Sequence, residues 1–257
     1  MGNQVVSTAP VVAFEKVCKR YPVGLLRRNH VQAVEDVTFS VAAGEIFGLL
    51  GPNRAGKTTL AKILLSLCRA TSGTTLRLGE PASNHRTLAR IGYMHENQAF
   101  PRYLTASGLL EYYGALTYVP RADLAKRIPK LLDRVGLADR SREPIARFSK
   151  GMVQRLALAQ SLINEPDLLV LDEPSEGLDL HGRQLVREVA RELRDAGKTV
   201  LLVSHVLAEV ERLCDRIAVL VNGKLVHVGP TAELSRDPKT GSTRSFEQAL
   251  RELYSKT

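Results

Sequence analysis

A glycine-rich segment has the residue types and the spacing of a phosphate-binding loop. Glycines let backbone N–H groups converge on phosphate oxygens, and the helix that follows adds the positive end of its dipole. We expect the lysine to contact the β- and γ-phosphates and the first threonine to bind Mg²⁺. The alternative, a turn with an exposed lysine, does not explain why the segment lies between an apolar run and a helical pattern. The segment consists of Gly51, Pro52, Asn53, Arg54, Ala55, Gly56, Lys57, Thr58 and Thr59, matching G-x-x-x-x-G-K-[ST].

An acidic pair ends a second apolar run. Leu168 to Leu171 are followed by Asp172, Glu173 and Pro174. Because successive strand residues point to opposite sides, adjacent carboxylates can take different roles. We expect Asp172 to hold Mg²⁺ and Glu173 to polarise the attacking water. Alone, such a pair is usually a solvated turn; beside a phosphate loop, a nucleoside triphosphatase is the better interpretation.

Strands and helices alternate around these two segments. Short apolar runs indicate buried strands at 45–50, 167–173 and 199–205, and residues 60–67 show the apolar spacing of one helical face. Residues 103–147 are mainly helical in pattern. The sequence therefore predicts an α/β protein with a three-layer core of parallel strands and helices, into which the helical stretch is inserted.

Composition narrows the class of protein. The 257 residues are 44% hydrophobic and 25% charged with a mean hydropathy of −0.10, which excludes wholesale disorder and fibrous repeats. No apolar run approaches the roughly 20 residues of a membrane span, and the N-terminal segment does not read as a secretion signal. Three scattered cysteines indicate ordinary thiols of a reducing cytosol. The net charge of +9 fits an anionic partner: nucleotide, nucleic acid or lipid headgroups.

A third motif stands between the first two. The stretch FSKGM, followed by Gln154 and Arg155, places Gly151 21 residues before Asp172. It resembles the signature of ABC ATPases, in a variant common among exporter-type subunits, and the likeness runs from about residue 12 to 230. The resemblance implies a P-loop NTPase core with an antiparallel β subdomain and an inserted helical subdomain. It also implies an ATP-sandwich dimer, with each ATP between one phosphate loop and the other subunit's signature.

The resemblance assigns roles to single residues, each with an alternative. Ser149 and Gly151 would contact the γ-phosphate, or merely cap a helix. Tyr21, expected just after the first strand, would stack on adenine, or pack at the surface. Asp179 would link the two sites across the dimer, or cap a helix. His205 would be the switch histidine that touches the γ-phosphate, or a structural residue at a strand end.

Three positions depart from the family pattern. The residue that senses the γ-phosphate through Mg²⁺ is usually glutamine; here the alignment gives Glu96, with Gln98 as the alternative. Arg54 stands where glycine is usual, which costs about 1 kcal/mol or more if that position demands a positive φ. Lys150 and Met152 replace glycine and glutamine of the commonest signature. No required group is lost, so we expect an active ATPase.

The expected partners are a second ATP-binding subunit and a membrane permease. The basic loop at 22–30, with Arg27 and Arg28, is a solvated loop or a contact with headgroups or a membrane subunit. Aromatics thought to be exposed at Phe100, Tyr103, Tyr112 and Tyr113 suit permease docking or core packing. The resemblance places the chain in the cytoplasm, peripheral to the membrane.

We expect the ATP-binding domain at 1–230, with a helical subdomain at about 97–150 and a tail at 231–257. Ser245 and Gln248 predict a helix start in that tail, whose apolar face packs on the domain or extends the dimer interface.

The leading functional hypothesis is the subunit that hydrolyses ATP to drive export of an unknown substrate. The alternatives are a soluble ABC ATPase acting on nucleic acid or the ribosome, and a regulator without catalysis. The absence of sustained heptads and of basic tracts interleaved with aromatics argues against direct nucleic-acid binding. Intact Lys57, Asp172, Glu173 and His205 argue against loss of catalysis.

Overall fold

A computed structural model describes residues 9–23, 29–236 and 244–255. Within them, the core is a mostly parallel sheet whose central strands are buried at every position. This sheet has the strand order β10 (Lys224–Pro230), β9 (Arg216–Val221), β3 (Ile46–Leu50), β8 (Thr199–Ser204), β7 (Leu168–Asp172) and β6 (Ile91–Met94). Strands β9 to β6 run parallel and β10 pairs antiparallel with β9. Every residue of β3, β7 and β8 is buried, as expected for parallel strands covered on both faces.

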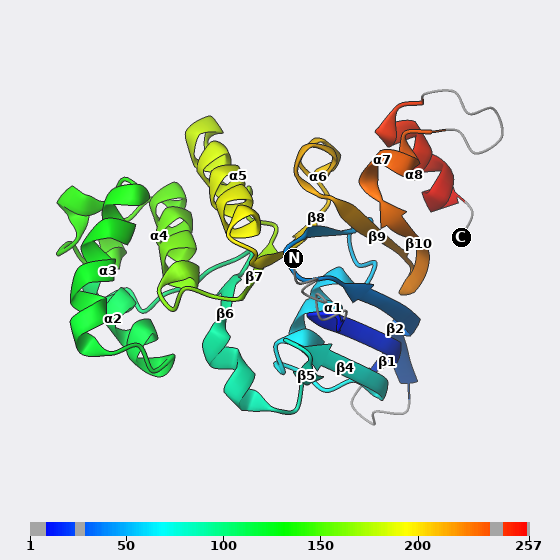
Figure 1. Cartoon of the computed structure of the whole chain (residues 1–257), viewed down its shortest axis with the longest axis horizontal. Helices are drawn as coiled ribbons and strands as arrows, with labels where there is room; N and C mark the ends of the chain where they lie inside the picture. The colour runs from blue at the N-terminus through cyan, green and yellow to red at the C-terminus, as the bar shows by residue number, and fades with distance from the viewer. Residues whose placement is uncertain (1–8, 24–28, 237–243, 256–257) are drawn as a thin grey trace, which may run out of the picture.

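A second, antiparallel sheet forms a separate layer. Its order is β2 (Asn29–Val41), β1 (Val12–Val23), β4 (Ser72–Arg77) and β5 (Glu80–Pro81). Figure 1 shows this sheet beside α1 (Lys57–Leu64), on the other side of the parallel sheet from α5 (Leu180–Asp195). Phe14 and Phe39 of this sheet belong to the same apolar cluster as Phe47 of β3 and Leu60 of α1. The molecule therefore has three layers.

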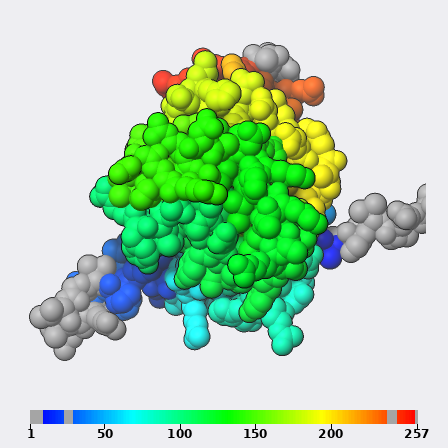
Figure 2. Space-filling view, turned by 90° about the vertical axis from the view of Figure 1, so that its left-hand side faces the viewer, coloured from blue at the N-terminus to red at the C-terminus, as the bar shows by residue number. Residues whose placement is uncertain are grey.

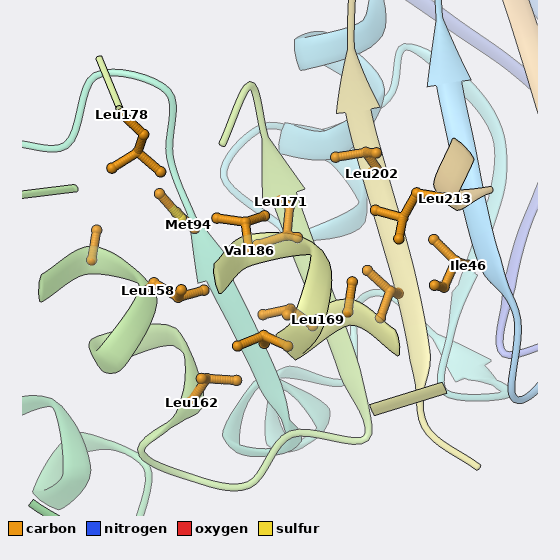
Figure 3. Packing of buried hydrophobic residues seen from close by; sticks show 14 of the residues in the cluster. Ile46, Met94, Leu158, Leu162, Leu169, Leu171, Leu178, Val186, Leu202 and Leu213 are labelled. Carbon is orange, nitrogen blue, oxygen red and sulfur yellow. The ribbon is translucent and has the colours of Figure 1, made fainter. Parts of the chain in front are cut away.

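The two faces of the parallel sheet pack against different helices. In β7, Leu168 and Val170 face the cluster that contains α1, whereas Leu169 and Leu171 face the cluster that contains α4 (Lys150–Leu162) and α5. Figure 3 shows Leu169 and Leu171 meeting Val186 of α5 between the helices and the sheet. Because side chains alternate along a strand, α1 and α4 lie on opposite faces.

A helical region covers the β6 end of the sheet. It contains α2 (Ala106–Leu116) and α3 (Arg121–Arg134), joined to α4 through short 3₁₀ turns at Ala138–Arg140 and Ile145–Arg147. Figure 2 views the molecule from this side, and the green residues of the region cover most of that face. Thr105 caps α2 by accepting a hydrogen bond from the Gly108 N–H at 3.1 Å.

The tail folds back on the domain as predicted. Helix α8 (Phe246–Ser255) begins with the predicted reciprocal pair: Ser245 Oγ accepts from the Gln248 N–H at 3.1 Å, and Gln248 Oε1 accepts from the Ser245 N–H at 3.4 Å. Phe246 and Leu250 are buried in the main apolar cluster. The helix packs on α6 (Leu207–Leu213) and α7 (Thr231–Leu234).

The predicted fold class is confirmed, and two local expectations are wrong. Tyr21 lies inside β1, because pairing with β2 continues to the register Tyr21–Val31 and beyond. Phe100 is buried, because it packs edge-on against Tyr113 with 6.1 Å between ring centroids. Tyr113, also expected at the surface, is half-buried against the main apolar cluster, whereas Tyr103 and Tyr112 are exposed as expected. Arg27 and Arg28 lie outside the described residues. Among the described helices, none has both the length and the apolar character to cross a bilayer.

Candidate functional site

The phosphate loop connects β3 to α1 in a backbone path that two glycines make possible. At Gly51, with φ +152°, an added Cβ would lie 2.2 Å from the Leu220 carbonyl oxygen. At Gly56, with φ +104°, it would lie 2.4 Å from the Ala33 carbonyl oxygen. Such contacts with backbone cannot be relieved by a side-chain movement, so both positions require glycine. The loop shape is therefore fixed by its sequence.

Arg54 adopts the conformation for which glycine is usually selected. Its φ is +67°, so this position does have the positive φ that makes arginine unfavourable, and the backbone strain is on the order of 1 kcal/mol. Its side chain is exposed beside Asn53. The loop therefore carries a strained residue that presents an additional cation at its surface.

Lys57 is held against its own loop. Its Nζ donates hydrogen bonds to the carbonyl oxygens of Gly51 at 2.7 Å and Pro52 at 3.1 Å. Burial lowers the pKa of Lys57, and the carboxylates of Glu173, Asp172 and Glu96 oppose that shift. The first turn of α1 has no side-chain cap. A buried ammonium and uncapped N–H groups thus occur together where phosphates would bind.

Asp172 ends β7 with a buried carboxylate. Both of its oxygens lack a hydrogen-bond partner among the described residues. Burial, together with Glu173 and Glu96, raises the pKa of Asp172 to about 6. A desolvated carboxylate without partners is costly unless a cation completes it. The residue therefore fits a Mg²⁺ ligand, since Mg²⁺ prefers carboxylate oxygen and is usually held by one or two carboxylates plus substrate phosphates.

Glu173 stands next to Asp172 but beyond the end of the strand. Its φ of +50° turns it away from the extended path, so a left-handed residue rather than strand alternation separates the two carboxylates. Glu173 Oε1 lies 2.8 Å from His205 Nδ1, and its Oε2 accepts from Ser204 Oγ and from the His205 N–H, each at 3.3 Å. The predicted acid and histidine are therefore in direct contact.

Glu96 lies within electrostatic range of the acidic pair and the phosphate-loop lysine. The charge of Glu96 contributes to the raised pKa of Asp172 and opposes the lowered pKa of Lys57. Glu96 is therefore close enough to influence both groups. This position is compatible with the expected role of Glu96 as the γ-phosphate sensor, and the choice between Glu96 and Gln98 stays a prediction.

The signature is well formed but belongs to the other face of the sheet. Ser149 caps α4 by accepting a hydrogen bond from the Met152 N–H at 3.3 Å, with Gly151 in the same turn. Asp179 caps α5 by accepting from the Gly182 N–H at 2.8 Å. Both residues thus act as helix caps in the single chain, and α4 and α1 are separated by the sheet.

Tyr21 is a half-buried ring beside the phosphate-loop helix. Its hydroxyl lies 3.7 Å from Cys68 Sγ, and Lys19 Nζ stands 4.9 Å from the ring centroid. Burial raises the pKa of its hydroxyl. A ring fixed from one side is compatible with stacking on the other, so its predicted role stands as a proposal.

Three contacts were not anticipated from the sequence. Ser204 reaches Glu173; Gln154 bonds to two loops; and Lys150 Nζ pairs with Glu176 Oε1 at 3.1 Å. The only available signal was position, since Ser204 precedes the histidine and Gln154 follows the signature.

Comparison with known proteins identifies the family. Residues 34–176 match the family described as ABC transporter. An ABC transporter ATP-binding protein of Synechocystis sp. is 42% identical over 245 residues, covering 95% of this chain and 68% of the relative. A Nod factor export ATP-binding protein I of Ralstonia nicotianae is 38% identical over 231 residues, covering 89% and 70%. A solved ATP-binding subunit of an ABC transporter superposes with a TM-score of 0.85 at 28% identity, covering 95% and 99%. This chain belongs to the ABC transporter family and carries its ATPase domain.

Proposed function

We propose that this chain hydrolyses Mg²⁺-ATP between two copies of itself and so drives export through a separate membrane permease. One observation carries the chemical part. The carboxyl ends of β3, β7 and β8 bring together a phosphate-loop lysine, a partnerless buried carboxylate and the Glu173–His205 pair.

Each residue has a step in this reaction. Backbone N–H groups from Gly51 to Thr59, Lys57 and the dipole of α1 bind the phosphates. Glu173 Oε1 orients the attacking water and accepts its proton, while His205 fixes the Glu173 carboxylate and reaches the γ-phosphate. Thr58, Asp172 and Glu96 would hold Mg²⁺, which neutralises charge on the β- and γ-phosphates when bound. Tyr21 stacks on the adenine.

The dimer follows from the positions of two helix starts. Gln154, one turn into α4, bonds to carbonyls that follow β6 and β7, so α4 begins at the same sheet edge as α1. The two helices pack on opposite faces, however, so Ser149 and Gly151 cannot approach phosphates bound at α1 of the same chain. A second copy, turned head to tail, supplies its signature and its Asp179 to the site. Closed twofold symmetry then makes two equal sites.

Transport is supported by the relatives and by the helical region. One relative is a Nod factor export ATP-binding protein, and the signature variant is of exporter type. Tyr103 and Tyr112 are 82% and 53% exposed, which suits docking of a permease. The subunit would thus sit on the cytoplasmic face of the membrane, with its ATP-binding domain at 1–230, its helical subdomain at about 97–150 and its tail at 231–257. No direct contact with nucleic acid is needed.

The test is recovery of the tagged chain from detergent-solubilised membranes, with ATP and the Glu173→Gln variant to hold the closed dimer. A polytopic protein that co-purifies with Glu173→Gln, and is lost with Lys57→Ala, is the expected result. Recovery with ribosomes or DNA, and only from the soluble fraction, would contradict the transporter role in favour of the nucleic-acid alternative.

A further inference from the structure

Gln154 is a buried side chain that joins three parts of the site. It lies in the second turn of α4 and is only 2% exposed. Its amide nitrogen donates to the Glu96 carbonyl oxygen at 2.9 Å and to the Glu176 carbonyl oxygen at 3.3 Å. One amide thus connects the signature helix with the loop after β6 and the loop after β7.

Both loops carry residues of the proposed reaction. The first holds Glu96, and the second runs from Glu173 to Asp179, the N-cap of α5. The carbonyl of Glu176 lies between the water-activating residue and the residue that faces the second copy. A displacement of α4 would therefore be transmitted to both loops through the same side chain.

A second tie lies one turn earlier on the same face of α4. Lys150 Nζ pairs with Glu176 Oε1 at 3.1 Å, and the aliphatic stem of Lys150 crosses Gly177, where an added Cβ would lie 2.7 Å from Lys150 Cε. The positive φ of +74° at Gly177 brings that backbone under the stem. This ion pair is exposed and so contributes little by itself, which leaves the buried amide as the principal connection.

We propose that Gln154 is a positioning residue that makes the signature helix, the Glu96 loop and the Glu176 loop move as one unit. The inference depends on the proposed function: when Ser149 and Gly151 engage the nucleotide of the second copy, Gln154 carries that movement to Glu96 and Asp179. Gln154 is almost fully buried and its hydrogen bonds go to backbone carbonyls, so it acts through the two loops.

The test compares Gln154→Leu and Gln154→Glu with a matched control, Gln160→Leu. Gln160 lies on the same helix, is half-buried, and makes no side-chain hydrogen bond to any described residue. Leucine keeps the volume and removes both donors; glutamate keeps the shape but places a carboxylate beside two carbonyl oxygens. Steady-state kinetics should show kcat reduced about tenfold in Gln154→Leu, and further in Gln154→Glu, with KM for ATP within about twofold. Gln160→Leu should match the wild type.

A second readout does not depend on hydrolysis. In the nucleotide-free protein, hydrogen exchange should accelerate in both 95–99 and 174–179 for Gln154→Leu, and in neither for Gln160→Leu. Wild-type kcat in Gln154→Leu, or acceleration confined to α4, would overturn the inference. A kcat loss matched by an equal loss of ATP binding would also overturn it, as a purely structural effect. If the wild type does not hydrolyse ATP, the proposed function fails, while the exchange experiment still decides the mechanical connection.

Discussion

The two helix starts that face nucleotide in the proposed dimer are built in opposite ways. Helix α1 begins without a side-chain cap, next to a partnerless Asp172 and two residues, Arg54 and Glu173, with positive φ. Helix α4 begins with Ser149 bonded to the Met152 N–H, and Gln154 bonds to the neighbouring loops. The start of α1 is thus held in a costly state that a ligand relieves. The start of α4 is capped within the chain, although Gln154 Oε1, one turn further on, is buried without a hydrogen-bond partner among the described residues.

This difference indicates which helix start is stabilised by ligand binding. Unpartnered buried polar groups and strained backbone persist at sites where the surrounding fold overdetermines them. Here the fully buried strands β3, β7 and β8 provide that rigidity. ATP and Mg²⁺ should therefore stabilise the start of α1 strongly. They should stabilise the start of α4 only when it contacts the nucleotide of a second copy.

The largest expected effect is at Glu173, the residue proposed to activate water. Glu173→Gln keeps the size of the side chain but removes the group that accepts the proton. We expect kcat to fall by about 10²–10⁴ while ATP affinity stays within a few-fold, measured by phosphate release and by equilibrium binding. Retained hydrolysis would show that another group activates water.

Lys57→Ala tests phosphate binding at the start of α1. Its ammonium is the buried cation of the loop, so ATP affinity should fall by about 100-fold in equilibrium binding. Lys62→Ala, on the same helix, is the control and should bind ATP normally. Equal affinity of both variants would mean that the phosphates bind elsewhere.

Asp172→Asn tests the free-energy cost of burying the charged Asp172 carboxylate beside the phosphate loop. The raised pKa of Asp172, about 6 against an ordinary 3.8, means that the folded state binds the proton more tightly than the unfolded state. The charged form therefore lowers stability above pH 6, and this penalty fades as the pH falls from about 6 towards 4. Without nucleotide, the variant should be more stable than the wild type by on the order of 2 kcal/mol at pH 8, with the gap closing at pH 4. If urea titration gave equal free energies of unfolding for the two proteins at pH 8, it would contradict the claim that the unpaired charge of Asp172 destabilises the folded state.

Ser149→Ala, at the start of α4, should change stability in the opposite direction. Losing the cap of α4 should lower stability by about 1 kcal/mol, and kcat should fall about tenfold through the second copy. ATP affinity of the monomer should not change. Thermal unfolding measures the first effect and dilution-dependent kinetics the second. A variant more stable than the wild type would contradict the difference proposed between the starts of α1 and α4.

Local patterns predicted much of this molecule. The phosphate loop, the buried strand before Asp172 and the tail cap at Ser245 depend on residues close in sequence, and the fold class follows from their order. Ser149 and Asp179 had two interpretations each, and the structure shows the cap in both cases. Their roles in the dimer remain predictions.

Contacts between distant segments could not be predicted. The bonds of Gln154 join residues 58 and 22 positions away, and Ser204 meets Glu173 across 31 positions. Phe100 was expected at the surface because its partner Tyr113 is on another element. The left-handed backbone at Glu173 is imposed by the turn after β7, which side-chain periodicity does not reveal.

The central claim, a site shared by two copies, is tested most directly by mixing two inactive variants. Lys57→Ala removes the phosphate-loop lysine. Gly151→Asp places a carboxylate where the signature is proposed to meet phosphate. An added Cβ there would meet only the Gly177 carbonyl oxygen at 3.5 Å, an ordinary contact. In a mixed dimer one site carries both changes and the other carries neither. The mixture should recover about a quarter of the wild-type ATPase rate, since half of the dimers then hold one intact site. No recovery, with both variants folded and dimeric, would contradict a shared site.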